Sequence, residues 1–277
     1  MTKPLIRTKD LSVEFSIGGK IFNKKTLKAV NDVTFEIPRG AFVGVVGESG
    51  SGKTTLGRAL LNAVDITGGE AEYDDGEVQF DLANMSPADL KEYRRRAQLI
   101  FQDPYAALSP RMTVRDIIAE PLEVMGLTKS REETDARVRE IAGKCRLNLE
   151  HLRRYPHAFS GGQRQRISIA RALASNPRFV IADECVAALD VSIQADILNL
   201  LKSLQKDLGL TFMFISHDLS VVAHTCDHVV VMYHGKIVES APTRELFANP
   251  QQDYTRNLLA AIPSLDPDQK SRAPAVG

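Results

Sequence analysis

The chain is most constrained by one loop, GESGSGKTT, which directly follows the apolar run AFVGVVG. The loop matches the pattern G-x-x-x-x-G-K-[ST], and the helical periodicity of KTTLGRALLNAV comes immediately after it. Glycines at these positions let backbone N–H groups converge on phosphate oxygens, and the start of the helix favours the same negative charge. The pattern predicts a phosphate-binding loop between a buried strand and a helix. Its predicted contacts are Gly47, Glu48, Ser49, Gly50, Ser51, Gly52, Lys53, Thr54 and Thr55.

Strand and helix patterns alternate through the rest of the chain. LIRTKDLSVEF and AVNDVTFEIPRG show the alternation of antiparallel strands, and GGEAEYDDGEVQFD is typical of a hairpin. A helical stretch then separates these from the strand patterns RFVIADE and TFMFISHD. The order predicts an α/β fold, with a P-loop NTPase core, an antiparallel β-subdomain and an inserted α-helical subdomain. We expect one domain over 1–250 with the helical insertion at about 88–160, and a C-terminal extension over 251–277 that ends in a disordered tail.

Bulk composition argues against several other classes of protein. The chain has 277 residues with 35 Lys+Arg and 35 Asp+Glu, so no net positive field favours nucleic acid. Its three cysteines, Cys145, Cys185 and Cys226, show no C-x-x-C spacing, which fits a reducing compartment and gives no disulfide or zinc pattern. The N-terminal residues lack the apolar segment of a signal peptide, and no apolar run is long enough to span a bilayer. We expect a chain that enters no membrane by itself.

Polar side chains follow three further apolar strands. FVIADE ends in Asp183 and Glu184, FISHD contains His217, and LIFQD contains Gln102. Asp183 can hold Mg²⁺ together with Thr54, and Gln102 can contact the metal or a water. Glu184 can polarise an attacking water, and His217 can contact the γ-phosphate and help to hold that water. The predicted catalytic residues are therefore Glu184, His217 and Gln102, and the predicted metal ligands are Thr54, Gln102 and Asp183.

A second glycine-rich loop, FSGGQ, occurs more than a hundred residues after the first and precedes the helical pattern RQRISIARAL. Backbone N–H groups of two adjacent glycines, a serine hydroxyl and a helix N-terminus together form a second cradle for an anion. The residues of this cradle are Ser160, Gly161, Gly162 and Gln163. One nucleotide site in one chain explains only one phosphate-binding loop, so the role of the second loop needs a separate explanation.

The ordered set GESGSGKT, Gln102, FSGGQ, VIADE, Leu189–Asp190 and His217 resembles the ATPase subunits of ABC transporters, over about residues 5–245. The resemblance implies that ATP and Mg²⁺ are bound and that two subunits associate head to tail. The SGGQ loop of one subunit then caps the γ-phosphate held by its partner, and Asp190 lies at the same interface. The resemblance also implies that Phe15 stacks on adenine, although Phe22 is a competing candidate for that role.

Narrower features resemble the ATPases of oligopeptide and dipeptide importers. They are FQDPYAALSPRMTV, FSGGQRQRISIARAL, ALDVSIQADILNLL and the C-terminal stretch Pro250 to Pro263. The resemblance implies a subunit that hydrolyses ATP to energise peptide import, peripherally attached to the cytoplasmic face of the inner membrane. Its implied partners are two transmembrane permeases, a second ABC ATPase (the same chain or a different one) and, indirectly, an extracytoplasmic substrate-binding protein, with no nucleic acid.

Two alternatives belong to other functional classes. One is a soluble ABC-type ATPase of a cytosolic complex, such as a phosphonate-degrading assembly or a DNA-repair machine. The repair version predicts a long coiled-coil insertion or zinc motifs, and the sequence contains neither. The other is a nucleotide-binding regulator without turnover, which predicts the loss of Glu184 or His217, and both are present. The chain departs from the usual family pattern at Cys185 and Ala187, and a thiol beside Glu184 suggests the hypothesis of redox sensitivity.

Overall fold

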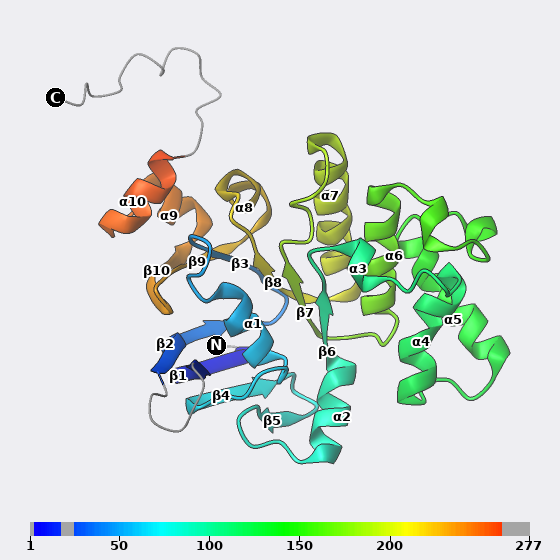
Figure 1. The fold of residues 1–277 in the computed structure, drawn as a ribbon, viewed down its shortest axis with the longest axis horizontal. Coiled ribbons are helices and arrows are strands. Elements are labelled where there is room, and N and C mark those ends of the chain that lie inside the picture. The colour runs from blue at the N-terminus through cyan, green and yellow to red at the C-terminus, as the bar shows by residue number, and fades with distance from the viewer. Residues whose placement is uncertain (1–2, 18–24, 262–277) are drawn as a thin grey trace, which may run out of the picture.

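The structure is a computed structural model that describes residues 3–17 and 25–261. Its strands form two sheets, seen at the lower left and in the centre of Figure 1. The antiparallel sheet has the order β2-β1-β4-β5, with β1 (Ile6–Ile17), β2 (Lys25–Ile37), β4 (Gly68–Asp74) and β5 (Gln79–Asp81). The core sheet has the order β10-β9-β3-β8-β7-β6, with β3 (Phe42–Val46), β6 (Ala97–Ile100), β7 (Phe179–Asp183), β8 (Thr211–Ile215), β9 (His228–Tyr233) and β10 (Lys236–Pro242).

The core sheet is parallel from β6 to β9, and β10 returns antiparallel to β9 as the edge hairpin. Strands β3 and β8 are buried at every residue, as the continuous apolar runs predict for strands covered on both faces. Parallel pairing brings the carboxyl ends of β3, β6, β7 and β8 to one edge of the sheet. That edge is where ligands bind in folds of this class, and every predicted catalytic residue follows one of its strands.

The antiparallel sheet packs its apolar face over the helix that follows the first glycine-rich loop. This helix, α1 (Lys53–Leu60), buries Leu56 and Leu60 in a hydrophobic cluster shared with both sheets. The strand residues of that cluster include Ile6, Leu11, Val30, Ile37, Val45 and Ile181. The loop at the start of α1 is therefore held between two sheets.

The segment from about residue 88, where the helical insertion is expected to start, contacts the two sheets. Helix α2 (Pro87–Arg96), capped by Ser86, packs Tyr93 edge-on against Tyr73 and Phe80 of the antiparallel sheet. Strand β6, which follows at once, pairs with β7 in the core sheet. Residues 88–100 therefore contact the two sheets: Tyr93 packs on the antiparallel sheet, and β6 is a strand of the core sheet.

The helices of the insertion form a block on the right of Figure 1, beyond β6. They are α3 (Pro104–Ala107), α4 (Val114–Met125), α5 (Arg131–Lys144), two short 3₁₀ turns (Leu149–His151 and Pro156–Ala158) and α6 (Gly161–Leu173), which leads back to β7. Thr113 caps α4 and Ser130 caps α5, each through a side-chain oxygen that accepts a backbone N–H. The apolar sides of α4, α5 and α6 share one hydrophobic core with the core sheet and with α7 (Val191–Leu208).

The C-terminal elements lie next to the β9–β10 hairpin, at the upper left of Figure 1. They are α9 (Thr243–Ala248) and α10 (Asp253–Ala260), and they follow α8 (Leu219–Thr225) and the hairpin in the chain. The tail that the sequence predicts to be disordered falls at 262–277, outside the described residues, as does Phe22. Among the helices that are described, none combines the length and apolar character needed to cross a bilayer.

Candidate nucleotide-binding and catalytic site

The first glycine-rich loop runs from the end of β3 to the start of α1 and needs glycine at specific places. Gly47 has φ 146°, and a Cβ there would lie 2.1 Å from the Met232 carbonyl oxygen of β9. Gly52 has φ 103°, and a Cβ there would lie 2.3 Å from the Ala29 carbonyl oxygen of β2. Both positions combine left-handed backbone with close approach of another chain segment, so no other residue fits. The loop is wedged between the core sheet and the antiparallel sheet.

Lys53 lies inside the curve of this loop. Its ammonium donates hydrogen bonds of 2.8 Å to the carbonyl oxygens of Gly47 and of Glu48, and its side chain is almost fully buried. Burial lowers the pKa of Lys53, and the nearby carboxylates Glu184 and Asp183 oppose that shift. A desolvated positive charge at a helix N-terminus is a strong site for an anion.

Thr54 and Asp183 bring two hard oxygen ligands together. The Thr54 hydroxyl donates to Asp183 Oδ1 at 3.1 Å, although 129 residues separate the two. Burial raises the pKa of Asp183; the Thr54 hydrogen bond opposes this rise, and adjacent Glu184 adds to it. A carboxylate whose charge is disfavoured by its surroundings is stabilised by a cation, so these residues fit Mg²⁺.

The protein provides only part of such a metal's shell. Within 3–17 and 25–261, no group of three or more His, Cys, Asp or Glu side chains could hold a metal alone. Mg²⁺ at nucleotide sites is usually held by one or two protein oxygens, with phosphate and water oxygens completing the octahedron. The sparse set formed by Thr54 and Asp183 is therefore the kind that a nucleotide-bound metal requires.

Glu184 is contacted by both other predicted catalytic residues. Gln102 Nε2 donates to Glu184 Oε2 at 2.9 Å, and His217 Nδ1 lies 3.4 Å from Glu184 Oε1. Glu184 has φ 46°, and its backbone N–H donates to the Ile215 carbonyl of β8, so its left-handed backbone is fixed by the neighbouring strand. The ends of β6, β7 and β8 thus converge on one carboxylate.

The second glycine-rich loop is ordered by its own residues. Ser160 caps α6 and forms a reciprocal capping box with Gln163, with hydrogen bonds of 3.0 and 3.4 Å. Gly162 packs against α7, where an added Cβ would lie 2.5 Å from Ile193 Cγ2. In the described part of the chain, no hydrogen bond joins residues 160–163 to the first loop. The structure does not bring the two loops together within one chain.

The two remaining predicted contacts are exposed and lie apart from these hydrogen-bonded clusters. Asp190 starts α7 as its N-cap residue, but its side chain makes no capping hydrogen bond. Phe15 lies on β1 with 39% of its surface exposed and pairs across the strands with Leu27, which is also exposed. An exposed ring beside an exposed aliphatic side chain suits a flat apolar ligand. The competing candidate Phe22 is not among the described residues.

Cys185, next to Glu184, is buried, and this weakens the hypothesis of redox sensitivity. Only 1% of its surface is exposed, and burial raises the pKa of its thiol to about 12. Since the thiolate is the reactive form, such a group is a poor target for oxidants. Cys185 packs in the hydrophobic core that β7 shares with the helical block.

One residue beside the first loop has no counterpart among the sequence predictions. The Glu48 backbone N–H donates to the Tyr254 hydroxyl of α10 at 3.1 Å. The two residues are 206 positions apart, and no local pattern marks an isolated tyrosine in a C-terminal helix as part of a phosphate loop. Only the tertiary structure identifies it.

A groove of about 750 Å³ borders the catalytic residues on the side of the helical block. It is lined by Thr54, Gln102 and Asp183 and by apolar side chains of the block, among them the exposed Phe101 and Val124. Large exposed apolar side chains beside a site of polar chemistry are typical of an interaction surface. Gln102 belongs both to the groove and to the contacts of Glu184.

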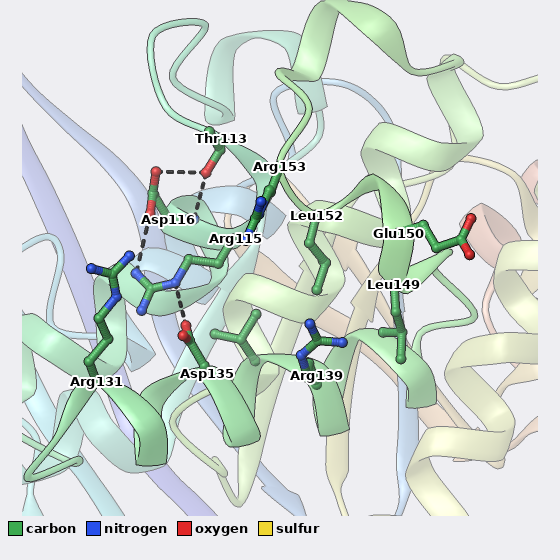
Figure 2. A pocket seen from close by; sticks show the side chains of 11 residues that line it. Thr113, Arg115, Asp116, Arg131, Asp135, Arg139, Leu149, Glu150, Leu152 and Arg153 are labelled. Atoms are coloured by element: carbon green, nitrogen blue, oxygen red, sulfur yellow. Dashed lines mark hydrogen bonds and ion pairs between the residues drawn. The ribbon is translucent and has the colours of Figure 1, made fainter.

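A separate hollow of about 500 Å³ lies within the helical block itself (Figure 2). Arg115 of α4 is at its centre and donates to Asp135 of α5 at 2.7 Å, with Asp116 and Glu123 as further partners. The Arg115–Asp135 pair joins α4 to α5, and the other two partners lie in α4 itself. The hollow contains none of the residues that the sequence assigns to the nucleotide site.

Comparison with protein-family models gives two matches. Residues 30–187 match the model described as "ABC transporter", and residues 238–276 match "Oligopeptide/dipeptide transporter, C-terminal region". The first match includes Lys53, Gln102, the SGGQ loop and Glu184. The second starts in β10 and includes α9 and α10.

Curated relatives match almost the whole chain. The "Oligopeptide transport ATP-binding protein OppF" of Bacillus subtilis is 51% identical over 97% of this chain and 85% of that protein. The "Dipeptide transport ATP-binding protein DppF" of Lactococcus lactis is 49% identical over 100% of this chain and 88% of that protein.

Solved structures agree with the fold. A dimeric post-hydrolysis state of the ATP-binding cassette MJ0796, bound to ADP and Pi, matches with TM-score 0.75 and 28% identity over 86% of this chain and 99% of that one. The cbiO1 protein of Clostridium perfringens, part of an ABC transporter complex, matches with TM-score 0.77 at 24% identity over 90% of this chain and 92% of that one, which supports the fold alone. The expected α/β fold with a P-loop core is confirmed. The chain belongs to the ATP-binding proteins of the ABC transporter family and carries the C-terminal region of its oligopeptide and dipeptide members.

Proposed function

We propose that this chain binds and hydrolyses MgATP as the energising subunit of a peptide importer. The observation that carries the enzymatic part is the Glu184 carboxylate, held between the Gln102 amide and the His217 imidazole beside the Thr54–Asp183 pair. The importer part is supported by relatives near 50% identity that are described as oligopeptide and dipeptide transport ATP-binding proteins. A soluble ATPase of a cytosolic complex finds no comparable support.

The residues of the first loop would bind the nucleotide phosphates. Lys53 would exchange its two carbonyl partners for phosphate oxygens, and the N–H groups at the start of α1 would complete the cradle. Phe15 would stack on the adenine ring. Thr54, Asp183 and Gln102 would hold Mg²⁺, which neutralises charge on the phosphates when bound.

Glu184 would accept the proton of the attacking water. General-base assistance of this kind contributes about 10²–10⁴ in rate. Gln102 and His217 already bind its two carboxylate oxygens, so the base is oriented by groups from β6 and β8. His217 is exposed and can turn toward a γ-phosphate, and this movement would leave Glu184 Oε1 free for the water.

The second loop would serve another copy of this fold. Ser160, Gly161, Gly162 and Gln163 would cap the γ-phosphate bound by a partner ATPase, which is either the same chain or a related one, with Asp190 at the same interface. Support comes from Ser160 and Gln163, which are exposed and ordered by their own capping box; among residues 3–17 and 25–261, this loop makes no hydrogen bond to its own P-loop. A site divided between two chains closes only while ATP joins them.

The groove beside Gln102 would receive a segment of a transmembrane permease. Its apolar lining suits a short helix from such a partner, and Gln102 connects it to Glu184. The helical subdomain, which we place at residues 104–160, would then transmit movement between permease and catalytic site. Attachment to two permeases would hold the chain at the cytoplasmic face of the membrane and, through them, couple it to a substrate-binding protein.

Affinity purification of the tagged protein from its own cells in mild detergent tests the transport assignment. We expect two polytopic permeases and an ATPase partner to co-elute, and hydrolysis by the complex to require Mg²⁺. If only soluble proteins co-elute, the transport assignment is wrong, and a cytosolic ABC ATPase becomes the better description.

A further inference from the structure

The C-terminal helix α10 makes direct contact with the phosphate loop. The Glu48 N–H donates to the Tyr254 hydroxyl at 3.1 Å, and Glu48 is the second residue of the loop. The same residue's carbonyl oxygen accepts the 2.8 Å hydrogen bond from Lys53 Nζ. Both backbone polar groups of Glu48 are therefore fixed: the carbonyl oxygen by Lys53 of the loop, and the N–H by Tyr254 of the C-terminal extension.

The ring of Tyr254 is positioned by the β9–β10 hairpin. It packs on Tyr233, with ring centroids 4.2 Å apart. The hairpin itself contacts the loop, because the Gly235 N–H donates to the Ser51 carbonyl at 3.0 Å and the Met232 carbonyl borders Gly47. The phosphate loop therefore contacts the β9–β10 hairpin directly, and Tyr254 adds a contact between the loop and α10.

The start of α10 is fixed by a carboxylate from the same hairpin. Glu239 of β10 accepts the backbone N–H groups of Gln251 and Gln252 at 2.8 and 3.1 Å. Although burial opposes it, these hydrogen bonds hold the pKa of Glu239 below its usual range. Hydrogen bonds to a charged acceptor are stronger than neutral ones, so the position of Tyr254 is set by an anchored helix.

We propose that Tyr254 is a positioning residue that holds the phosphate loop in its binding shape, so that the C-terminal extension contributes to nucleotide affinity. The inference rests on the proposed ATPase function of the loop. A loop ordered in advance loses less conformational entropy when a ligand binds. Tyr254 touches the backbone of the loop and is placed neither as a base nor as a metal ligand, so its effect falls on binding and leaves the chemical step unchanged.

The test is Tyr254→Phe in the full chain, which removes one oxygen and keeps the ring on Tyr233. Titration calorimetry with MgADP and steady-state hydrolysis of MgATP give Kd, KM and kcat. We expect Kd and KM to rise about 3- to 10-fold, the range for one neutral hydrogen bond, with kcat within about twofold of the parent. Because calorimetry needs no turnover, it tests Tyr254 even if the parent proves to hydrolyse nothing, which would instead refute the proposed function.

Two further variants separate positioning from general destabilisation. Tyr155→Phe removes an exposed tyrosine hydroxyl in the helical block and should leave Kd unchanged. Glu239→Gln weakens the anchor of α10 and should raise Kd in the same direction as Tyr254→Phe, by a smaller factor. An unchanged Kd in Tyr254→Phe, or a fall in kcat at unchanged Kd, would overturn the proposal.

Discussion

The two glycine-rich loops of this chain resemble each other in sequence and differ in what surrounds them. The first, at Gly47–Thr54, is wedged between two sheets and contacts carbonyl oxygens of β2 and β9, with a buried lysine in its curve. The second, at Ser160–Gln163, satisfies its polar groups by its own capping box, and Ser160 and Gln163 are exposed. Both lead into the first turn of a helix, whose N–H groups have no partner within the helix itself.

Under the proposed function, the first loop belongs to a complete phosphate site and the second loop supplies half of another. At the first loop, Lys53 donates to loop carbonyl oxygens, Thr54 donates to Asp183 and Gln102 donates to Glu184, and the two carboxylates lie near enough to Lys53 to affect its pKa. The second loop has a helix N-terminus and a serine hydroxyl, and the guanidinium of Arg164, which follows it, donates to the carbonyl oxygens of Pro156 and His157. Substitutions at the first loop's site should therefore change the nucleotide chemistry of the chain that contains them. Substitutions at the second loop should change only the association of that chain with a partner.

The largest effect is expected at the base of the first site. Glu184→Gln keeps the contact with Gln102 but cannot accept a proton, so kcat should fall by at least about 10²-fold, while ATP binding persists. ATP should then trap a dimer, which light scattering detects. Glu150→Gln, a change of the same kind in the helical block, should leave kcat unchanged. Parental turnover by Glu184→Gln would show that another group is the base.

A smaller effect, confined to association, is expected at the second loop. Ser160→Ala, combined with Glu184→Gln, should weaken ATP-driven dimerisation at least about tenfold, because the partner's phosphate loses a hydrogen bond to charge. The MgATP affinity of the single chain should stay within about twofold. Ser130→Ala removes an equivalent helix cap from α5 and should not affect dimerisation. If Ser160→Ala weakens binding to the single chain, the second loop serves its own nucleotide.

Stability should distinguish the two adjacent glycines of the second loop. A Cβ at Gly162 would lie 2.5 Å from Ile193, so Gly162→Ala should reduce the free energy of unfolding by about 1–3 kcal/mol. At Gly161 the nearest atom would be Leu189 Cδ2 at 3.5 Å, an ordinary contact, so Gly161→Ala should be neutral or slightly stabilising. Urea unfolding measures both. Equal values for the two variants would contradict the packing of α6 on α7.

The smallest effect is expected for the thiol beside Glu184. Burial raises the pKa of Cys185 to about 12, so little thiolate exists near neutral pH, and peroxide should inhibit the parent and Cys185→Ser equally. Because the folded pKa exceeds the ordinary value of 9.0, this thiol's contribution to stability is complete below pH 9 and is lost as pH rises toward 12. Selective protection of Cys185→Ser from peroxide would restore the redox hypothesis.

Local patterns predicted what depends on local chemistry. The phosphate loop and the strands ending in Gln102, Asp183–Glu184 and His217 each have a signal within about ten residues. The fold class followed from the order of those signals. The contacts of Gln102 and His217 with Glu184 are seen only in the structure, where parallel strands present their carboxyl ends at the same edge.

What sequence could not predict depends on packing between distant segments. Residues 88–100 are expected from the sequence to be part of the helical insertion. In the structure, Tyr93 packs on aromatic rings of the antiparallel sheet, and β6 pairs with β7. Tyr254 reaches Glu48 across 206 positions because the hairpin and Glu239 place α10 there. No periodicity or motif in the sequence indicates either contact, because both depend on how helices and strands that are distant in the sequence pack against one another.

The contact of Gly162 with Ile193 has a mechanical consequence. Ser160 is the N-cap of α6 and Asp190 is the N-cap of α7, and the two helices pack together within one turn of both caps. Because this packing is close, we expect a shift of α6 to move α7 with it, and so to move Ser160 together with Asp190. Under the proposed function, a partner ATPase that contacts Ser160 or Asp190 would therefore respond to the position of both helices.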